Sequence, residues 1–288
     1  FSGDFFWSIH VIIKNILTIC SEINNLSYSD KFIQNIAELF YNNNNLKQNN
    51  YELDYLPLGI ISIFGPFNLP AHLSHGQILT ALLMGNTVVF KPSPLTPLVG
   101  KWLANLWENL PEGVFHLVQG GVTTAQHIMS QKELRGIIFI GSHRAGRSIH
   151  KYLGGRPEVM LALEMGGNNP LIVGHVDTKN MKSIIYNIIQ SHLITSGQRC
   201  VAARRLILPQ GRLGDDILHQ LSTCLENVQG GDPMLPGNYY GPVIHEESAQ
   251  ALLQKQMYLG EQGYITKSHL SMNLSRAHRA YITPGLIE

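Results

Sequence analysis

From Leu58 onward, short apolar runs rich in β-branched residues alternate with longer segments whose apolar positions recur at helical spacing. The short runs predict buried strands, and the longer segments predict amphipathic helices. The predicted strands cover residues 59–64, 87–90, 114–118, 136–140, 160–164, 171–173 and 205–208. The predicted helices lie near residues 72–84, 97–109, 122–131, 145–153, 178–195, 213–228 and 246–262. This alternation indicates an α/β fold with a mostly parallel sheet covered by helices on both faces.

The two ends of the chain show other patterns. Apolar residues at helical spacing predict one amphipathic helix over residues 5–23. An asparagine-rich stretch follows over residues 24–50, and it predicts a connector with a short helix near residues 32–40. The last 40 residues show helix and turn patterns, and we predict no strand there that closes a sheet.

Composition narrows the classes of function. The 288 residues are 44% hydrophobic and only 14% charged, against about 25% charged in an ordinary globular protein. This balance excludes a disordered tail and a coiled coil, and a net charge of +1 gives no field that attracts nucleic acid. Three scattered cysteines fit a reducing compartment better than a disulfide framework. No apolar run reaches the ~18 residues of a membrane span, and the 13 histidines show no metal-binding spacing. We therefore expect no nucleic-acid partner, no membrane and no bound metal.

Polar residues follow four of the predicted strands. Asn68 lies in the loop after the first strand, Lys91 directly follows the second, and Glu164 ends the fifth. A turn with two glycines, residues 141–146, follows the fourth strand. Because the carboxyl ends of parallel strands share one edge of a sheet, where α/β proteins bind ligands, we expect these groups to meet there.

The turn over residues 141–146 has three interpretations. With Arg147 and Ser148 it reads G-x-x-x-x-G-R-S, one residue from the phosphate-loop pattern, which requires lysine in place of Arg147. A strand, a glycine turn and a helix N-terminus also suit the phosphates of a dinucleotide. The third interpretation is an ordinary turn between a strand and a helix. Lys91 is similarly open, as a surface lysine or as a cation for a ribose hydroxyl or a phosphate.

Cys200, Glu164 and Asn68 each have a chemical and a structural interpretation. Cys200 lies in a turn of small residues beside Arg199, where a reactive thiolate could form, although an isolated cysteine is more often a small buried hydrophobic residue. Glu164, if buried at the end of its strand, could act as a general base, and it could equally cap a turn. Asn68 could donate a hydrogen bond to an oxyanion or cap backbone groups.

Five motifs occur together in one order and spacing. They are Gly65-Pro-Phe-Asn68, Phe90-Lys91-Pro-Ser, Phe139-Ile-Gly141-Ser142, Leu163-Glu164-Met-Gly-Gly-Asn168-Asn-Pro170 and Gly197-Gln-Arg-Cys200. This arrangement resembles the NAD(P)-dependent aldehyde dehydrogenase superfamily over roughly residues 57–245. Within it, the runs 117–121, 162–170 and 197–206 are most similar to the branch that oxidises N-succinylglutamate 5-semialdehyde in bacterial arginine degradation.

The resemblance implies a role for each matched residue. Cys200 would attack the aldehyde carbon, Asn68 and the Cys200 backbone N–H would hold the oxyanion, and Glu164 would activate water. The implied cofactor is NAD, with NADP as the alternative. The residues implied to bind it are Lys91, Gly141, Ser142, His143, Arg144, Ala145 and Gly146. Arg199 is the candidate contact for a dicarboxylate substrate. The resemblance also implies a cytoplasmic enzyme with a small-molecule aldehyde substrate, whose full-length form is a homo-oligomer, either a dimer or a tetramer.

The resemblance also divides the chain into three parts. Residues 1–57 hold the N-terminal helix and the asparagine-rich connector, and residues 58–165 form a Rossmann-like dinucleotide-binding domain. Residues 166–288 form an α/β catalytic domain that is incomplete at its C-terminus. Because the family's C-terminal third has no counterpart here, we expect a fragment of a longer enzyme that alone lacks most of the activity. Two alternatives are a dehydrogenase for another semialdehyde and an inactive remnant that binds a dinucleotide.

Overall fold

The structure, a computed structural model, describes residues 56–174, 176–272 and 280–288. The chain divides into two compact units, Phe1–Met165 and Gly166–Glu288. The predicted helix over residues 5–23 and the asparagine-rich connector lie outside the described residues. Within the described residues, no helix combines the length and the apolar character that crossing a membrane requires.

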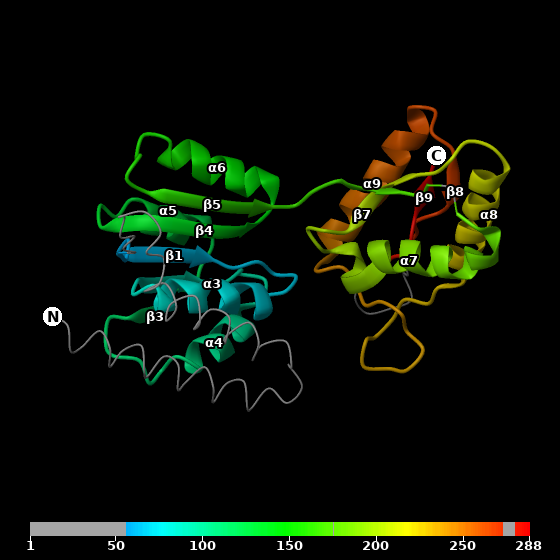
Figure 1. Ribbon diagram of the computed structural model, residues 1–288. Helices are drawn as coiled ribbons and strands as arrows, with labels where there is room; N and C mark the ends of the chain where they lie inside the picture. Colours follow the sequence, from blue (N-terminus) through cyan, green and yellow to red (C-terminus); the bar gives the residue numbers. More distant parts are fainter. Residues whose placement is uncertain (1–55, 175, 273–279) are drawn as a thin grey trace, which may run out of the picture. The chain divides into compact units, whose positions relative to one another are not determined.

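A five-stranded sheet forms the centre of the first unit (Figure 1). Its strands are β1 (Ile60–Phe64), β2 (Thr87–Lys91), β3 (Phe115–Leu117), β4 (Leu134–Gly141) and β5 (Met160–Met165). They lie in the order β3-β2-β1-β4-β5, and every neighbouring pair is parallel. The chain therefore winds outward from β1 toward one edge and from β4 toward the other. Open α/β sheets bind their ligands where the winding diverges in this way, at the carboxyl ends of the strands.

Helices cover both faces of this sheet. They are α3 (His72–Leu83), α4 (Pro97–Asn105), α5 (Val122–Met129) and α6 (His143–Leu153). Apolar residues of α3 and α4 pack with Ile63 and Phe90 on one face, and those of α5 and α6 pack with Phe64 and Phe139 on the other. Because successive strand residues point to opposite faces, a continuous apolar strand such as β1 supplies both cores. The prediction of an α/β fold with a parallel sheet covered by helices is confirmed.

The second unit is built on a parallel pair of strands. β6 (Asn169–Ile172) and β7 (Ala203–Ile207) pair with each other, and α7 (Met181–Leu193) lies between them in the sequence. The helices α8 (Arg212–Asn227) and α9 (Glu246–Glu261) follow. Leu171 and Leu206 pack from one face of the strand pair against the buried apolar residues of α7 and α8. On the other face, Ile172 is 71% exposed and Ile207 is 48% exposed.

A short antiparallel pair near the C-terminus corrects one prediction. β8 (Thr266–Ser268) pairs with β9 (Leu286–Ile287), although the sequence predicts no such strand in this region. Segments of three and two residues are too short to show the alternating pattern by which a strand is predicted. Their pairing depends on distant partners, since Ile265 and Glu288 exchange backbone hydrogen bonds of 2.7 and 2.8 Å.

Candidate active site

Four of the predicted site residues lie at one edge of the sheet in the first unit. Lys91 is the last residue of β2, Gly141 is the last residue of β4, and Glu164 lies next to the end of β5. Asn68 follows in the loop directly after β1. Because these strands are parallel, their carboxyl ends and the loops after them lie on the same edge.

Lys91 is buried at this edge, with 7% of its surface exposed. Its Nζ donates hydrogen bonds to the backbone oxygens of Gly120 at 3.0 Å and Pro92 at 3.2 Å. Nζ also lies 5.7 Å from the centre of the Phe64 ring. Burial lowers the pKa of the Lys91 ammonium group, because the charged form is poorly solvated there. Lys91 thus ties the end of β2 to the loop after β3, and these two bonds use two of the three protons of its ammonium group.

Gly65 shapes the loop that carries Asn68. A Cβ at position 65 would collide with Ser74 Oγ and lie 3.1 Å from the Phe90 ring, so only glycine lets the loop pass this close to α3 and β2. Asn68 is half-buried, and its Oδ1 accepts a hydrogen bond from Leu69 N–H at 3.0 Å. This bond fixes the plane of the amide and identifies Nδ2 as its donor end.

The helix α6 begins directly after β4 with a capped N-terminus. Ser142 Oγ accepts a hydrogen bond from Ala145 N–H at 3.2 Å, and the Ser142 carbonyl accepts one from Gly146 N–H at 3.0 Å. Gly146 lies against Met165 of β5, whose sulfur would be only 2.5 Å from an added Cβ. The helix N-terminus therefore lies close against the sheet. The first N–H groups of a helix lack intrahelical acceptors, and together with the helix dipole they favour an anion.

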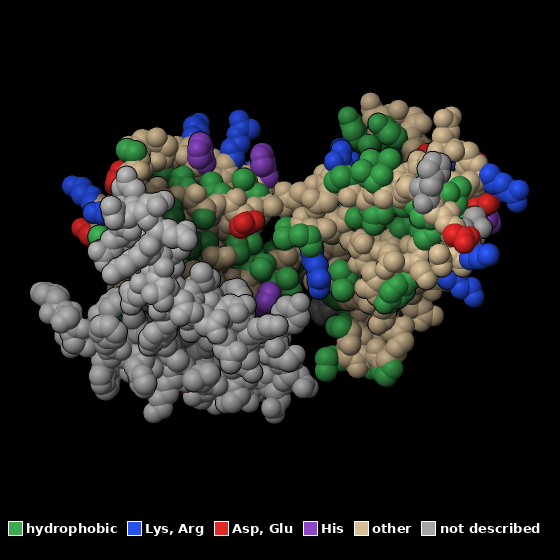
Figure 2. Space-filling view, in the orientation of Figure 1, with side chains coloured by type: hydrophobic (Ala, Val, Ile, Leu, Met, Phe, Trp, Pro, Cys, Tyr) green, Lys and Arg blue, Asp and Glu red, His purple; other side chains and the backbone are tan. Residues whose placement is uncertain are grey.

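Basic side chains surround this N-terminus. His143, Arg144 and Arg147 are exposed, and Figure 2 shows basic side chains gathered over α6. Gly141, just before the helix, has no room for a Cβ beside the Phe139 ring. A buried amine, close-packed glycines and a cationic helix N-terminus at one sheet edge fit the ribose and the diphosphate of a dinucleotide.

Glu164 differs from the expectation of a buried carboxylate, because it is exposed on β5. Leu161, Leu163 and Met165 of the same strand pack in the core with α6. Glu164 therefore lies on the opposite face of the sheet, since alternate residues of a strand point to opposite sides. The helices of that face, α3 and α4, pack against β1, β2 and β3 and leave Glu164 accessible to water. The apolar run around Glu164 is typical of a buried strand. The sequence does not show that β5 lies at the edge of the sheet, where one face is left uncovered.

In the second unit, Cys200 lies at the tip of a turn that precedes β7. Ala202 N–H donates to the Arg199 carbonyl at 3.2 Å, which closes a turn with Cys200 and Val201 at its centre. Both central residues are exposed, Val201 by 73% of its surface. The thiol is thus accessible, which excludes the interpretation of Cys200 as a small buried hydrophobic residue.

Two side chains hold the backbone before this turn. Ser196 Oγ donates to the Gly241 carbonyl at 2.8 Å, and Gln198 Oε1 accepts from Ile244 N–H at 2.9 Å. Thr195 and Ser196 have φ angles of 57° and 55°, in the left-handed region that costs energy for residues other than glycine. The bonds to Gly241 and Ile244 therefore stabilise a strained segment immediately before Cys200.

Asn169, the first residue of β6, holds the other side of the turn. Its Nδ2 donates to the Cys200 carbonyl at 2.7 Å and to the Ala202 carbonyl at 3.2 Å. Asn169 is not among the residues predicted from the sequence, because its partner Cys200 lies 31 residues away and no local pattern connects them. The signals for it in the sequence are its place in the motif over residues 163–170 and its polar character before an apolar strand.

Arg199 is half-buried and folds back onto its own loop. Its Nε donates to Thr195 Oγ1 at 2.8 Å, four residues earlier in the chain. The guanidinium group is therefore partly committed within the loop, and its contact with a substrate stays a prediction.

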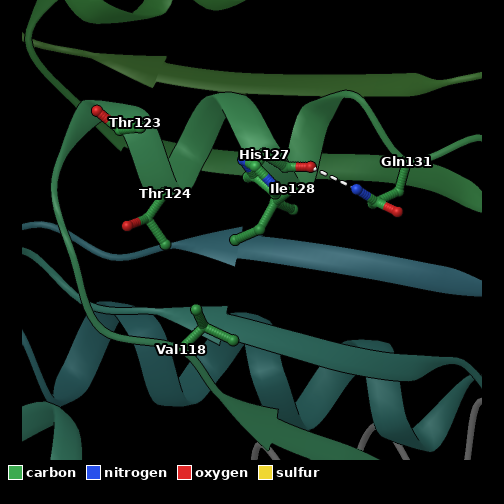
Figure 3. Close-up of a pocket in the computed structure, with 6 residues that line it drawn as sticks. All are labelled: Val118, Thr123, Thr124, His127, Ile128 and Gln131. Carbon is green, nitrogen blue, oxygen red and sulfur yellow. Dashed lines mark hydrogen bonds between the residues drawn. The ribbon is translucent and has the colours of Figure 1, made fainter.

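An open pocket of about 390 Å³ lies beside α5 in the first unit (Figure 3). Val118, Thr123, Thr124, His127, Ile128 and Gln131 line it. Figure 3 shows Thr124 and Ile128 pointing from the helix toward Val118, and Gln131 bonded to the His127 carbonyl. None of the predicted site residues lines it. In the described ranges of the chain, no three His, Cys, Asp or Glu residues form a group that could hold a metal ion.

The strand order and the helix N-terminus at the divergence point define the first unit as an α/β domain of the doubly wound, nucleotide-binding type. The aldehyde dehydrogenase family profile matches residues 14–287, and the chain belongs to this family. The predicted family is thereby confirmed.

Individual relatives agree with this assignment. An N-succinylglutamate 5-semialdehyde dehydrogenase of Vibrio cholerae serotype O1 is 43% identical over 244 residues, which are 83% of this chain and 49% of that protein. The chain thus spans about half the length of the curated relatives that it matches. The solved aldehyde dehydrogenase of Bartonella henselae superimposes with a TM-score of 0.74 at 25% identity, over 84% of this chain and 51% of that one. The NAD-dependent aldehyde dehydrogenase of Sinorhizobium meliloti also gives 0.74 at 25% identity, over 80% and 46%.

Proposed function

We propose that the chain is the cofactor-binding and nucleophile-bearing part of a cytoplasmic NAD-dependent dehydrogenase, which oxidises N-succinylglutamate 5-semialdehyde to N-succinylglutamate. The observation that carries the proposal is the exposed Cys200 at the tip of a hydrogen-bonded turn, held from both sides by side-chain bonds. The Vibrio relative at 43% identity supports the choice of substrate.

In the proposed reaction, Cys200 supplies the nucleophile. Its thiolate sulfur bonds to the aldehyde carbon, and the carbonyl oxygen becomes the oxyanion of a thiohemiacetal. Asn68 Nδ2 and the Cys200 backbone N–H donate hydrogen bonds to this oxyanion. The carbonyl then reforms as a hydride leaves the carbon, and a thioester remains on Cys200. Glu164 accepts a proton from water, the resulting hydroxide attacks the thioester, and the C–S bond breaks to release the carboxylate.

NAD is the proposed cofactor, with NADP as the alternative, and when bound it supplies the acceptor for the hydride. The buried Lys91 amine donates to a hydroxyl of the adenosine ribose with the proton that its two backbone bonds leave over. Gly141, Ser142 and the first turn of α6, which contains His143, Arg144, Ala145 and Gly146, hold the diphosphate. The absence of room for a Cβ at Gly141 and Gly146 supports this assignment, because it keeps the helix N-terminus close to the sheet.

The substrate and the assembly complete the proposal. N-succinylglutamate 5-semialdehyde carries two carboxylates, and Arg199 is the cation proposed to bind one of them. The whole enzyme is proposed to be a homo-oligomer, a dimer or a tetramer. Its aldehyde is a small molecule, and neither nucleic acid nor a membrane takes part.

The test compares two cysteine variants in the protein together with whatever flanking sequence its gene encodes. NADH formation is followed at 340 nm with N-succinylglutamate 5-semialdehyde, a second semialdehyde and a short unbranched aldehyde. We expect Cys200→Ala to lose about 10³-fold or more of the turnover, because no other thiol replaces the nucleophile. Cys224→Ala, on the half-buried cysteine of α8, is the matched control and should retain turnover.

The outcomes separate the function classes. Turnover of N-succinylglutamate 5-semialdehyde that depends on Cys200 supports the proposal. Cys200-dependent turnover of only another aldehyde would correct the substrate and retain the chemistry. Tight NAD binding without any turnover would identify an inactive dinucleotide-binding protein and contradict the proposal.

A further inference from the structure

We infer that Asn169 is a positioning residue for the proposed reaction, which fixes the turn so that the Cys200 backbone N–H can donate to the oxyanion. The inference rests on the proposed function. It goes beyond that function because it assigns a role to Asn169, to which the family resemblance gives none. It starts from the two hydrogen bonds of one amide group, to the carbonyls of Cys200 and Ala202.

The chemistry of these bonds identifies the donor. Two carbonyl oxygens lie 2.7 and 3.2 Å from Nδ2, and a carbonyl can only accept a hydrogen bond. The amide must therefore present its NH₂ group to them, and both of its protons are used. The Asn169 amide also packs against Gly167, where an added Cβ would lie 2.8 Å from Oδ1 and 3.3 Å from Nδ2.

The position of these bonds on the turn gives them their effect. The turn's own hydrogen bond joins Ala202 N–H to the Arg199 carbonyl and does not use the Cys200 N–H. Among the described residues, none accepts a hydrogen bond from that N–H. Asn169 holds the Cys200–Val201 peptide group through the Cys200 carbonyl and the Ala202–Ala203 group through the Ala202 carbonyl. The Cys200 N–H belongs to the preceding Arg199–Cys200 peptide group, whose carbonyl accepts the turn's own hydrogen bond from Ala202. By holding the two groups that flank this bond, Asn169 keeps the turn closed and the Cys200 N–H in a fixed direction. These bonds thus fix the turn without using the N–H or the thiol of the exposed Cys200.

The backbone directly before the turn is strained, so the turn depends on the hydrogen bonds that hold it. Thr195 and Ser196 keep left-handed φ angles only while surrounding bonds hold them, and such residues relax when a bond is removed. Ser196 and Gln198 hold the segment before the turn, and Asn169 holds the turn itself. Without Asn169, the turn can relax and carry the Cys200 N–H away from the direction that the oxyanion requires.

Asn169→Leu tests the inference in the protein together with whatever flanking sequence its gene encodes. Leucine has nearly the shape of asparagine, carries no charge and has no donor. Asn168→Leu is the matched control, because the hydrogen bond of Asn168 to Arg205 Nε runs through its backbone carbonyl and is kept. Asn169→Ala is a second variant, in which water can reach the two carbonyls if the leucine variant fails to fold. Thermal melting establishes that each variant is folded.

Two reactions of the same sulfur are measured for each variant. Aldehyde oxidation forms an oxyanion, whereas alkylation by iodoacetamide is a displacement at carbon that forms none. We expect kcat to fall about 10- to 100-fold in Asn169→Leu, with KM changed less than about threefold. This is less than the roughly 10²- to 10³-fold loss on removing one oxyanion donor, because the Cys200 N–H is misdirected and not removed. The alkylation rate of Cys200, read by peptide mass spectrometry against Cys224 in the same sample, should stay within about threefold of the wild type.

Each result decides the matter. The pattern of lower kcat, unchanged alkylation and a normal Asn168→Leu control supports the inference. An unchanged kcat in a folded Asn169 variant overturns it while the proposed function stands. A parallel fall in oxidation and alkylation also overturns it, because the thiol itself would then be displaced. If the wild-type protein shows no Cys200-dependent turnover, the proposed function fails and this inference fails with it.

Discussion

Lys91 is an ammonium group that the fold holds where water solvates it poorly. The lowered pKa and the 7% exposure describe the same cost, which the bonds to the Gly120 and Pro92 carbonyls offset in part. A fold that served stability alone could place an apolar side chain at the end of β2. We propose that the ammonium group lies here because a bound partner accepts its remaining proton.

Replacing Lys91 by methionine keeps the apolar stem and removes the charge and the donors. We expect the Kd for NAD to rise about tenfold or more, the loss of about 1.4 kcal/mol of binding free energy. Lys101→Met, on the exposed face of α4, should leave the Kd unchanged. Isothermal titration calorimetry measures both variants, and an unchanged Kd in Lys91→Met would remove Lys91 from the proposed cofactor site.

For single residues, the sequence best predicts which of them lie at the end of a strand or in the loop after it. Lys91, Asn68 and the 141–146 turn could be placed at one sheet edge because each lies at the end of an apolar run or in the loop after it. Asn169 could not be predicted, since its contact spans 31 residues and depends on the pairing of β6 with β7. The exposure of Glu164 could not be predicted either, because an apolar run does not state which strand forms the edge.

At the scale of elements, α4 shows how closely helices lie against the loops at this edge. A Cβ on Gly100 of α4 would collide with the Pro92 ring, which directly follows Lys91. A proline ring is rigid, so the contact cannot be relieved by rotation of a flexible side chain. Gly100 thus lets the helix pack against the segment that positions the end of β2.

Two glycine-to-alanine variants should change stability in opposite directions. Gly100→Ala should lower the free energy of unfolding by about 1–3 kcal/mol, because it overpacks the contact with Pro92. Gly76→Ala, in α3, meets no atom within 4 Å of the added Cβ, and it should raise the free energy of unfolding by about 0.5–1 kcal/mol. Urea unfolding followed by circular dichroism measures both. Equal stability of Gly100→Ala and the wild type would show that α4 shifts freely away from Pro92.

Long periodic elements are predicted well from this sequence, and short ones are not. α6 is predicted from residue 145 but begins at His143, because the Ser142 cap starts the helix earlier than its apolar pattern does. β8 and β9 are not predicted, because strands of three and two residues are too short to show an alternating apolar pattern. In both cases hydrogen bonds, rather than hydrophobic spacing, determine where the element lies.

At the scale of the whole molecule, alternation of elements indicates the fold class but not the strand order. Parallel strands joined by helices are compatible with several orders, of which the chain adopts β3-β2-β1-β4-β5. The order of the motifs adds the missing strand order, because it connects the chain to a family whose members share the fold. Each of the two units also contains a half-buried histidine.

These histidines, His75 in the first unit and His192 in the second, should make the stability of both units depend on pH. Burial is the main cause that lowers the pKa of each ring, with the charge of His72 adding to it at His75. At His192, the bond of Nδ1 to the Ala203 carbonyl at 3.0 Å opposes the effect in part. An unfolded histidine has a pKa of about 6.5, so between the two values the unfolded chain binds more protons than the folded one.

The free energy of unfolding should therefore be highest above about pH 7 and fall as the pH drops below about 6.5, until the folded ring is also protonated. His192→Asn keeps a donor near the position of Nδ1 for the Ala203 carbonyl but cannot titrate, so it should remove part of this dependence. His219→Asn, on the exposed side of α8 in the same unit, should keep the wild-type dependence. Urea unfolding at pH 7.5 and 5.5 measures the difference for each protein. If the wild type and His192→Asn lose equal stability between these values, the acid sensitivity of the second unit arises from groups other than this ring.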